Sequence, residues 1–427
     1  MRLSHSEPAI RHAVVAISTI HERAAGKCQA TVTDMNDCFA IQSYNKAITC
    51  LTSQRSVESS LHIPLTACVL FVCLEFFRGD VFAALRHIQG GLSILNSYQD
   101  SKSERRISAT HSPTSSYSSN PVEGDIIQAI KSIFSQLHFV NALFDPTSSP
   151  TVAPSGGCLN SFSSTPLVFT SVAQARQMRY DLGNRATALI MSASKAKYSM
   201  GISTEQITDR YLLEVQFQRW TKAMDEFMVR QYQHMSSQEQ KAAKVTMMHA
   251  LSSWINLSTC FSPEEMVFDQ YKDKFQKIVE LADGIIRDGS GCPSQALNPF
   301  SFELGLIPPL QFTVMKCRSP SVRRRALAIL GSSHWREGLF DSYRAYKVFS
   351  RVMAIEEAEL DDSQASPDCQ SLFSEAGMER LPSEVARIHY AHMTCVEYGA
   401  SQQPLTIFTK PNGVYGEWCI KQEIIKK

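Results

Sequence analysis

The feature that most constrains this chain is an apolar run that ends at a Gly-Asp pair and is followed by a pattern of helical period. Between Leu65 and Phe77 only Thr66 and Glu75 are polar. The run is 13 residues long. A helix that crosses a bilayer requires about 20 predominantly apolar residues. We therefore expect a helix buried in a packed core, and not a membrane span.

The residues around this run carry the signals of a helical hairpin. Pro64 suits the first turn of a helix, Gly79 suits a C-terminal stop, and Asp80 can cap the helix that comes next. After the cap, apolar residues recur at spacings of four and three, which is typical of an amphipathic helix: Val81, Leu85, Ile88, Leu92 and Leu95. The sequence predicts a buried helix, a tight turn and a second helix packed against the first.

Helical periodicity extends over most of the 427 residues, and it predicts an all-α, multi-helical fold of packed helical hairpins. Pro308 and Pro309 are expected to interrupt or kink any helix that contains them. The tail changes period: in LTIFTKPNGVYGEWCIKQEII, two β-prone runs flank a Pro-Asn-Gly turn at 411–413. This pattern predicts a small C-terminal β-hairpin.

Composition divides the chain into five parts. Serine-rich residues 100–121 contain almost no large apolar side chain, so burial cannot offset the entropy cost of ordering them, and we predict a mobile linker there. The predicted parts are an N-terminal helical part, this linker, a main helical part, a polar linker and a C-terminal helix followed by the β-hairpin. Their ranges are 1–99, 100–121, 122–360 (with a loop at 145–170), 361–380 and 381–427.

Charge and cysteine usage argue against several classes of protein. Lys plus Arg total 42 and Asp plus Glu total 41, whereas a protein that grips nucleic acid over its whole surface is clearly basic. The 12 cysteines are scattered and no C-x-x-C occurs, which indicates free thiols in a reducing compartment. Cys68 and Cys73 lie in the buried run, but a spacing of five places them well apart around a helix axis. We expect core cysteines there and not metal ligands.

Sequence motifs identify no catalytic, cofactor-binding or metal-ligating residue. Glycine-rich nucleotide motifs, a nucleophile elbow and a zinc-protease motif do not occur, and the sequence implies no cofactor. His21 with Glu22, and His334, have no nucleophile near them in the sequence. We interpret them as surface residues.

The densest basic segment comprises Arg323, Arg324 and Arg325. One interpretation is a basic patch that binds phosphate or serves in nuclear import. The favoured interpretation is the polar face of a helix that buries Val322 and Ala326. An acidic run over 356–362 is available to pair with these arginines.

Two serines in the predicted linker are candidate phosphorylation sites. Ser108 follows Arg105-Arg106-Ile107, a pattern that suits a basophilic kinase, and Ser112 precedes a proline. Such short matches are frequent by chance, so ordinary linker serines are the alternative.

Two blocks of the sequence and its tail are distinctive. The first block comprises SHSEPAIRHAVVAISTIHE and ACVLFVCLEFFRGDVFAALRHIQGGLSIL, the second is CRSPSVRRRALAILGSSHWREGLFDSYRAYKVFSRVMAIEE, and the tail contains TKPNGVYGEW. In this order they resemble the regulatory domain of fungal zinc-cluster transcription factors. In that family R-R-R-A and R-E-G-L-W-D-S are typical, and here Phe340 stands for the tryptophan.

The resemblance implies an all-helical, nuclear transcription regulator of a metabolic or secondary-metabolite gene set. Such factors normally carry a cluster of six cysteines that begins C-x-x-C, binds zinc and places a helix in the major groove of DNA. No cysteine here has that spacing, so no zinc ligand can be assigned, and direct DNA contact is not expected. The regulator would act through protein partners, such as a full-length factor of the same family, and without a membrane.

Two alternatives stay open. The chain could come from a truncated gene model of a complete DNA-binding factor, which a C-x-x-C upstream of Met1 in the genome would reveal. It could also be an all-helical enzyme or small-molecule-binding protein, whose sign would be a polar pocket with convergent titratable groups.

Overall fold

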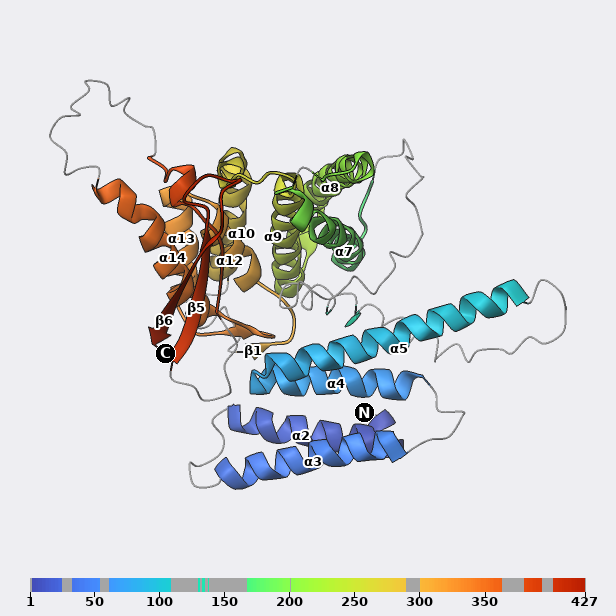
Figure 1. Cartoon of the computed structure of the whole chain (residues 1–427). Coiled ribbons are helices and arrows are strands. Elements are labelled where there is room, and N and C mark those ends of the chain that lie inside the picture. Colours follow the sequence, from blue (N-terminus) through green and yellow to red (C-terminus); the bar gives the residue numbers. More distant parts are fainter. Residues whose placement is uncertain are drawn as a thin grey trace, which may run out of the picture. The chain divides into compact units, whose positions relative to one another are not determined.

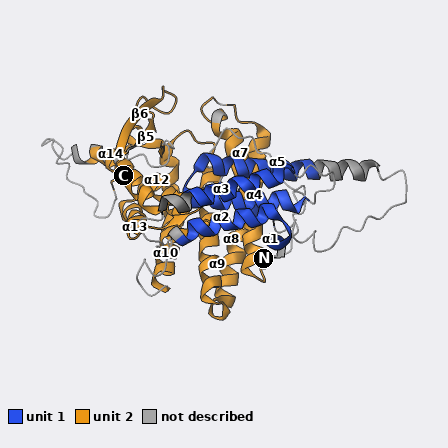
Figure 2. Ribbon diagram, turned by 90° about the horizontal axis from the view of Figure 1, so that it is seen from below, with its two compact units in different colours: residues 1–159 blue, residues 160–427 orange. Residues whose placement is uncertain are grey.

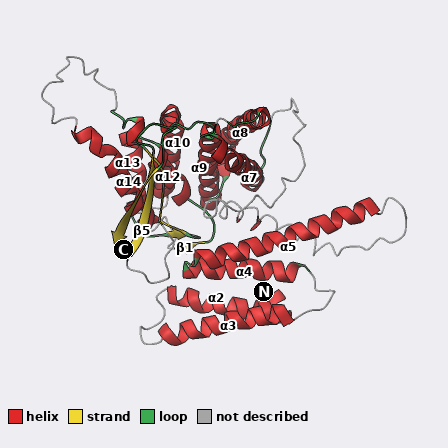
Figure 3. Cartoon of the chain, viewed as in Figure 1, coloured by secondary structure: helices red, strands yellow, loops and turns green. Residues whose placement is uncertain are grey.

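The computed structural model describes most of the chain, in these ranges: 2–24, 33–53, 61–108, 130, 133–134, 137, 167–199, 201–288, 300–362, 380–393 and 402–426. It divides into two compact units, Met1–Leu159 and Asn160–Lys427 (Figure 2). Helices dominate both units, and strands are confined to two small sheets (Figure 3). The predicted, mostly all-α fold class is confirmed.

Helices make up the described part of the first unit, and its four longer helices lie side by side (Figure 1). α2 packs against α3 and α4, and α4 packs against α5. Pro8 opens α2 because a first-turn residue has no intrahelical partner for its N–H. The helices are α1 Arg2–Ser6, α2 Pro8–Ala24, α3 Thr33–Ser53, α4 His62–Arg78 and α5 Val81–Ser108.

The predicted helical hairpin is confirmed in α4 and α5. Gly79 adopts the left-handed conformation, with φ 73°, and its N–H donates to the carbonyl oxygen of Phe76 at 3.2 Å. The Asp80 carboxylate accepts a hydrogen bond from the backbone N–H of Ala83 at 3.0 Å, which caps α5. Four of the five predicted apolar positions are buried: Leu85, Ile88, Leu92 and Leu95.

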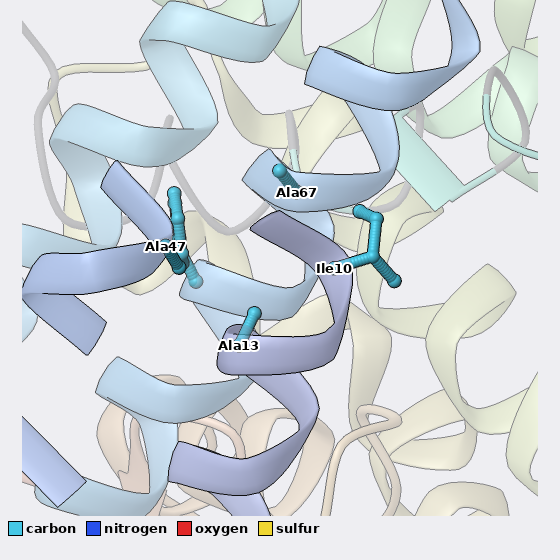
Figure 4. Packing of buried hydrophobic residues seen from close by; sticks show 5 residues of the cluster. Ile10, Ala13, Ala47 and Ala67 are labelled. Carbon is cyan, nitrogen blue, oxygen red and sulfur yellow. The ribbon is translucent and has the colours of Figure 1, made fainter. Parts of the chain in front are cut away.

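Small side chains bring α2, α3 and α4 close together. Ala13, Ala47 and Ala67 are fully buried, and Ile10 packs among them with the ring of Phe71 (Figure 4). Alanine at a helix contact lets the two backbones approach more closely than a larger side chain would. This cluster therefore fixes the spacing of the three helices.

The structure differs from the predicted linker over 100–121, because residues 100–108 are helical. α5 continues to Ser108, because Lys, Glu and Arg in SKSERRIS are good helix formers and adding a residue to an existing helix costs little. Helix propagation of this kind does not require burial. Residues 109–129 lie outside the described residues, as do 363–379 in the predicted polar linker.

The boundary between the units also differs from the prediction of a main part over 122–360. The described residues between 130 and 137 belong to the same compact unit as the N-terminal helices. Ile130, Phe134 and Leu137 are buried, and the Phe134 ring lies directly against Gly91 of α5. These apolar contacts, at a helical spacing of four and three, tie the segment to the first unit.

The second unit begins with three long helices, α7, α8 and α9, in agreement with the helical periodicity of the sequence. Ser203 and Ser236 each form a capping box with the residue three positions later, so α8 and α9 begin at strong start signals. The longer helices of this unit are α7 Val172–Ala196, α8 Thr204–Gln231, α9 Ser237–Thr259, η4 Glu265–Tyr271, α10 Lys272–Asp288, α12 Ile307–Lys316, α13 Pro320–Gly331 and α14 Ser342–Asp362.

The expectation for Pro308 and Pro309 was wrong, because both lie in the first turn of α12 and begin a helix. The carboxylate of Glu337 satisfies the donors that precede them. It accepts hydrogen bonds from three successive backbone N–H groups, those of Gly305, Leu306 and Ile307, at 2.9, 2.8 and 2.9 Å. A buried carboxylate at a helix N-terminus complements the helix dipole.

Two small sheets complete the second unit. The first is formed by the two-residue strands β1 Phe300–Ser301, β2 Arg336–Glu337 and β3 Phe340–Asp341. The second is antiparallel in the order β4-β5-β6, with β4 Ile388–Met393, β5 Gln402–Thr409 and β6 Cys419–Lys426. The predicted hairpin is confirmed as β5 and β6, and Gly413 takes φ 87° in its loop.

The predicted C-terminal helix after residue 381 was wrong. Only a three-residue turn, η5 Glu384–Ala386, precedes β4 among the described residues from 380 onward. The segment IHYAHM contains two residues that favour strands, Ile388 and Tyr390, and it pairs with β5. The pairing partner lies downstream in the sequence, so local periodicity could not reveal it.

Candidate functional site

A set of ionisable side chains, most of them charged, lies buried in the second unit, where α12, α13, α14 and β4 pack together. This ionic cluster comprises Glu265, Lys316, Arg318, Arg323, Glu356 and His389. The side chains of Arg318, Arg323 and Glu356 have no exposed surface. Charged side chains are rarely buried unless they are paired, so the contacts within the cluster determine what it can do.

Glu356 on α14 lies between two arginines. Its Oε1 accepts a hydrogen bond from Arg318 at 2.8 Å, and its Oε2 lies 2.6 Å from Nη2 of Arg323. The backbone N–H of Ile388 also donates to Oε1, at 2.7 Å. Burial alone would raise the pKa of the Glu356 carboxyl, but the two guanidinium groups outweigh burial and lower it.

Glu265 in η4 forms the second anionic centre. Its two oxygens accept hydrogen bonds from the Lys316 ammonium at 2.7 and 2.8 Å, and Arg318 donates to it at 3.2 Å. Burial raises the pKa of Glu265, and the attraction of Lys316 and Arg318 outweighs that effect, so the net shift is downward. Arg318 thus connects both carboxylates of the ionic cluster.

The segment that precedes β4 is bound to η4 by further charged contacts. Arg387 donates to both oxygens of Asp269 at 2.8 and 2.7 Å. The Glu384 carboxylate accepts from the backbone N–H groups of Glu265 and Met266 at 2.7 and 2.8 Å. These contacts hold His389, two residues after Arg387, against the ionic cluster.

A cavity of about 110 Å³ opens beside the ionic cluster. Lys197, Lys316, Glu265 and His389 line it together with apolar and small polar residues: Ile190, Ser194, Asn256, Thr259, Cys260, Ser262 and Phe268. Burial lowers the pKa of the Lys197 ammonium, and the Glu265 carboxylate partly offsets this shift. Burial raises the pKa of the Cys260 thiol to about 11, so this thiol is protonated at neutral pH.

His389 contributes a neutral imidazole to the cavity wall. Burial lowers its pKa to about 4, and the nearby carboxylate of Glu265 only partly opposes that. Its Nδ1 lies 3.4 Å from the hydroxyl of Tyr198, and its ring packs edge-on against Trp418. Its Nε2 is buried with no hydrogen-bond partner among the described residues. A carboxylate oxygen of Glu384 lies 3.8 Å from this nitrogen.

The structure separates the three arginines that were considered as a basic patch. Arg323 is buried in the ionic cluster, and its Nε donates to the carbonyl oxygen of Val314 at 2.9 Å. Arg324 pairs with Glu357 at 2.6 Å, and Arg325 pairs with both oxygens of Asp283. Successive positions of a helix point about 100° apart, so the three side chains cannot share one surface.

The basic-patch hypothesis is therefore wrong for Arg323. The polar-face interpretation holds for Arg324 and Arg325, whose side chains are 54% and 58% exposed. The expected pairing with the acidic run is confirmed for two arginines, since Glu356 contacts Arg323 and Glu357 contacts Arg324.

The other sequence candidates lie away from the ionic cluster. His21 is exposed, as expected, and so is His334, whose Nε2 lies 2.8 Å from a carboxylate oxygen of Asp341. Burial raises the thiol pKa of Cys68 and Cys73 to about 11, which agrees with core cysteines. Ser108 is the last residue of α5 and Ser112 lies outside the described residues, so phosphorylation of either stays a prediction.

Two other kinds of site are not found in the described part of the chain. Within the described ranges, no three His, Cys, Asp or Glu side chains converge in a way that could hold a metal ion. Nor does any helix in the described part of the chain combine the length and apolar character needed to span a membrane.

Sequence reasoning did not find Lys197, Glu265, Lys316, Arg318 or His389. These residues lie at the ends of helices, between helices and on β4, far apart in the chain. One signal in the sequence could have indicated buried arginines. Arg318 and Arg323 lie close to apolar residues at the start of α13, in the second of the two distinctive blocks.

Comparisons with known proteins do not assign the chain to a family. No protein-family model matches the chain, and neither a curated protein nor a solved structure matches it. The resemblance to zinc-cluster regulatory domains therefore remains an expectation, and a function has to be inferred from the geometry of the second unit.

Proposed function

We propose that the chain is a helical regulatory module that controls transcription of a limited metabolic or secondary-metabolite gene set through protein partners in the nucleus. The observation that carries this proposal is that the second distinctive block of the sequence, residues 317–357, supplies half of the ionic cluster. Arg318, Arg323 and Glu356 all belong to that block, and they contact one another in the core.

The resembling tail lies next to the same region. Lys410 and Trp418 both belong to TKPNGVYGEW, and the Lys410 ammonium lies 4.3 Å from the centre of the Trp418 ring. Trp418 in turn packs against His389 of the ionic cluster. Segments that resemble one domain in sequence are expected to form one folded core, and this arrangement supports the resemblance.

The ionic cluster also joins several elements of the second unit. Arg323 of α13 contacts Glu356 of α14, and Glu356 accepts a hydrogen bond from the backbone N–H of Ile388 in β4. We expect a partner protein to bind a surface that these joined elements carry. The partner surface itself is not assigned.

A tethering experiment tests the proposal directly. The whole chain is fused to a heterologous DNA-binding domain and placed upstream of a reporter gene. We expect reporter transcription to change relative to the DNA-binding domain alone. As a matched control, the Glu356→Gln fusion, whose core is destabilised, should lose the effect, whereas the Glu357→Gln fusion should keep it. An unchanged reporter with all three fusions would contradict the proposal.

Perturbation of the natural gene is the second test. Deletion and overexpression are expected to change transcripts of a limited set of genes, and a tagged chain is expected to co-purify with another nuclear protein. An unchanged transcriptome in both cases, with the protein found only outside the nucleus, would favour the enzyme alternative. Finding a C-x-x-C cluster in frame upstream of Met1 would favour the alternative of a complete DNA-binding factor.

A further inference from the structure

We propose that the cavity beside the ionic cluster binds a small carboxylate anion, with the ammonium of Lys197 as its principal contact. The cavity is the one lined by Lys197, Lys316, Glu265 and His389, and it lies wholly within the second unit. This binding goes beyond the proposed role in transcription and does not depend on it.

The charge of the surrounding groups favours an anion. The cationic side chains of the cluster and of the cavity surroundings outnumber the carboxylates that face them: Lys197, Lys316, Arg318, Arg323 and Lys410 against Glu265, Glu356 and Glu384. Arg387 and Asp269 form a balanced pair. Because burial makes unbalanced charge costly, an anion in the cavity would lower the electrostatic free energy of the region.

Lys197 is the cation that remains to be neutralised. Lys316 already donates to both oxygens of Glu265 and to the carbonyl oxygen of His389. By contrast, no described carboxylate lies within ion-pair distance of the Lys197 ammonium, whose contact is with the Tyr198 ring at 4.8 Å. A half-buried ammonium of this kind can donate up to three hydrogen bonds.

His389 contributes a neutral imidazole to the cavity wall. Its side chain is 2% exposed, and its Nε2 has no hydrogen-bond partner among the described residues, although a carboxylate oxygen of Glu384 lies 3.8 Å from it. Because a carboxylate already faces Nε2, the Lys197 ammonium is the group that would donate to the oxygens of a carboxylate guest.

Cavity size and lining define the class of anion. About 110 Å³ is well below the roughly 300–1,000 Å³ of pockets for drug-sized ligands, so the guest has only a few heavy atoms. Ile190 and Phe268 supply apolar surface for a short hydrocarbon part. A cation would face Lys197 and Lys316, and it is disfavoured for that reason. A short aliphatic monocarboxylate fits these properties.

The test uses the purified full chain and isothermal titration calorimetry with butyrate as the probe. Butanol and butylamine serve as neutral and cationic probes of the same length, and inorganic phosphate serves as a different anion. We expect saturable binding of butyrate, and weaker binding or none with the other three. Equal or tighter binding of butanol, butylamine or phosphate would overturn the carboxylate assignment, as would a failure of butyrate to bind at millimolar concentration.

Two variants locate the site. Lys197→Gln is expected to weaken butyrate binding at least about tenfold, because a charge-assisted hydrogen bond is lost. Lys222→Gln, a change of an exposed lysine on α8, should leave the affinity unchanged. Urea unfolding of each variant checks that it is folded. Equal affinity of folded Lys197→Gln and the unchanged chain would contradict the proposal.

A measurement on the unchanged chain supports the assignment without any variant. Binding of an anion beside an ammonium favours its charged form, so Lys197 should take up protons on butyrate binding at alkaline pH. Titrations at one alkaline pH in buffers of different ionisation enthalpy measure this uptake. Proton uptake is expected in the unchanged chain and not in Lys197→Gln; equal uptake in both would place the site elsewhere. These results stand whether or not the tethered chain changes transcription.

Discussion

The guanidinium of Arg318 meets the carboxylate of Glu356 at 2.8 Å, and neither side chain is exposed to solvent. Arg323 approaches the other oxygen of the same carboxylate at 2.6 Å. Desolvating such charges is costly, so the contact adds little stability compared with an apolar replacement of the whole group. Removal of one member has a different result, because it leaves the other charges buried and unpaired.

The first prediction concerns this carboxylate. Glu356→Gln keeps the shape of the side chain and removes the charge that Arg318 and Arg323 share. We expect the free energy of unfolding to fall by about 3–5 kcal/mol, the usual cost of breaking a buried ion pair. Urea unfolding followed by circular dichroism measures the change.

The matched control is the neighbouring position. Glu357 pairs with Arg324, whose side chain is 54% exposed, so water screens this pair. Glu357→Gln should therefore cost less than about 1 kcal/mol. If the two variants lost similar amounts of unfolding free energy, the prediction would be wrong. The buried ionic cluster would then be no more sensitive to the loss of one charge than the exposed pair is.

The second prediction compares two adjacent glycines on α5. A methyl group added at Gly90 would meet no atom within 4 Å, whereas one added at Gly91 would collide with the buried ring of Phe134. Gly90→Ala should stabilise the chain by about 0.5–1 kcal/mol, because alanine favours the helix. Gly91→Ala should destabilise it by about 1–3 kcal/mol through overpacking. Thermal unfolding midpoints that shift in the same direction would indicate that Phe134 does not pack on α5.

The hairpin of α4 and α5 was predictable because its signals are local. Gly79 takes the left-handed conformation that a helix stop favours, and Asp80 caps the next helix through an amide three residues away. The extent of α5 was not predictable from composition, since a polar segment continues a helix already held by its apolar face. β4 was missed because its strand pairing depends on β5, which follows it in the chain.

The third prediction concerns acid stability and rests on His249 of α9. Burial lowers the pKa of this imidazole to about 3, and its Nε2 lies 2.9 Å from the carbonyl oxygen of Gly305. Below about pH 6.5 the unfolded chain binds a proton here that the folded chain does not. Stability should therefore fall as pH decreases from about 6.5, by up to about 1.4 kcal/mol per pH unit for this residue.

Urea unfolding between pH 4 and 7 measures this dependence. His249→Gln should reduce its slope between pH 4 and 6 and leave a remainder, because burial also lowers the pKa of His389, to about 4. His234 is exposed and solvated in the folded and unfolded chains alike, so His234→Gln should leave the slope unchanged. An identical slope in His249→Gln and the unchanged chain would refute the linkage.

The ionic cluster was beyond sequence reasoning for a physical reason. Arg323, Arg324 and Arg325 look alike in the sequence, but the helix turns each in a different direction, and only the first faces Glu356 across the core. Which face of α13 is buried depends on the positions of α12 and α14. The pairing of Arg324 with Glu357 was easier to anticipate, since opposite charges on exposed faces attract whatever the packing.

The last prediction concerns DNA. A protein that neutralises several phosphates needs arginines or lysines free to approach them, and its affinity then falls steeply with salt. Here Arg323 is buried, Arg325 is held by Asp283, and Arg324 is held by Glu357, while the whole chain carries a formal net charge of +1. We expect retention of the purified chain on DNA to be weak, with a shallow dependence on salt. The double variant Arg324→Ala, Arg325→Ala should bind as the unchanged chain does, as measured by fluorescence anisotropy with a labelled duplex at several salt concentrations. Tight, sequence-selective binding at physiological salt that the double variant loses would show that these two arginines leave their carboxylates for phosphate, and the chain would then contact DNA itself.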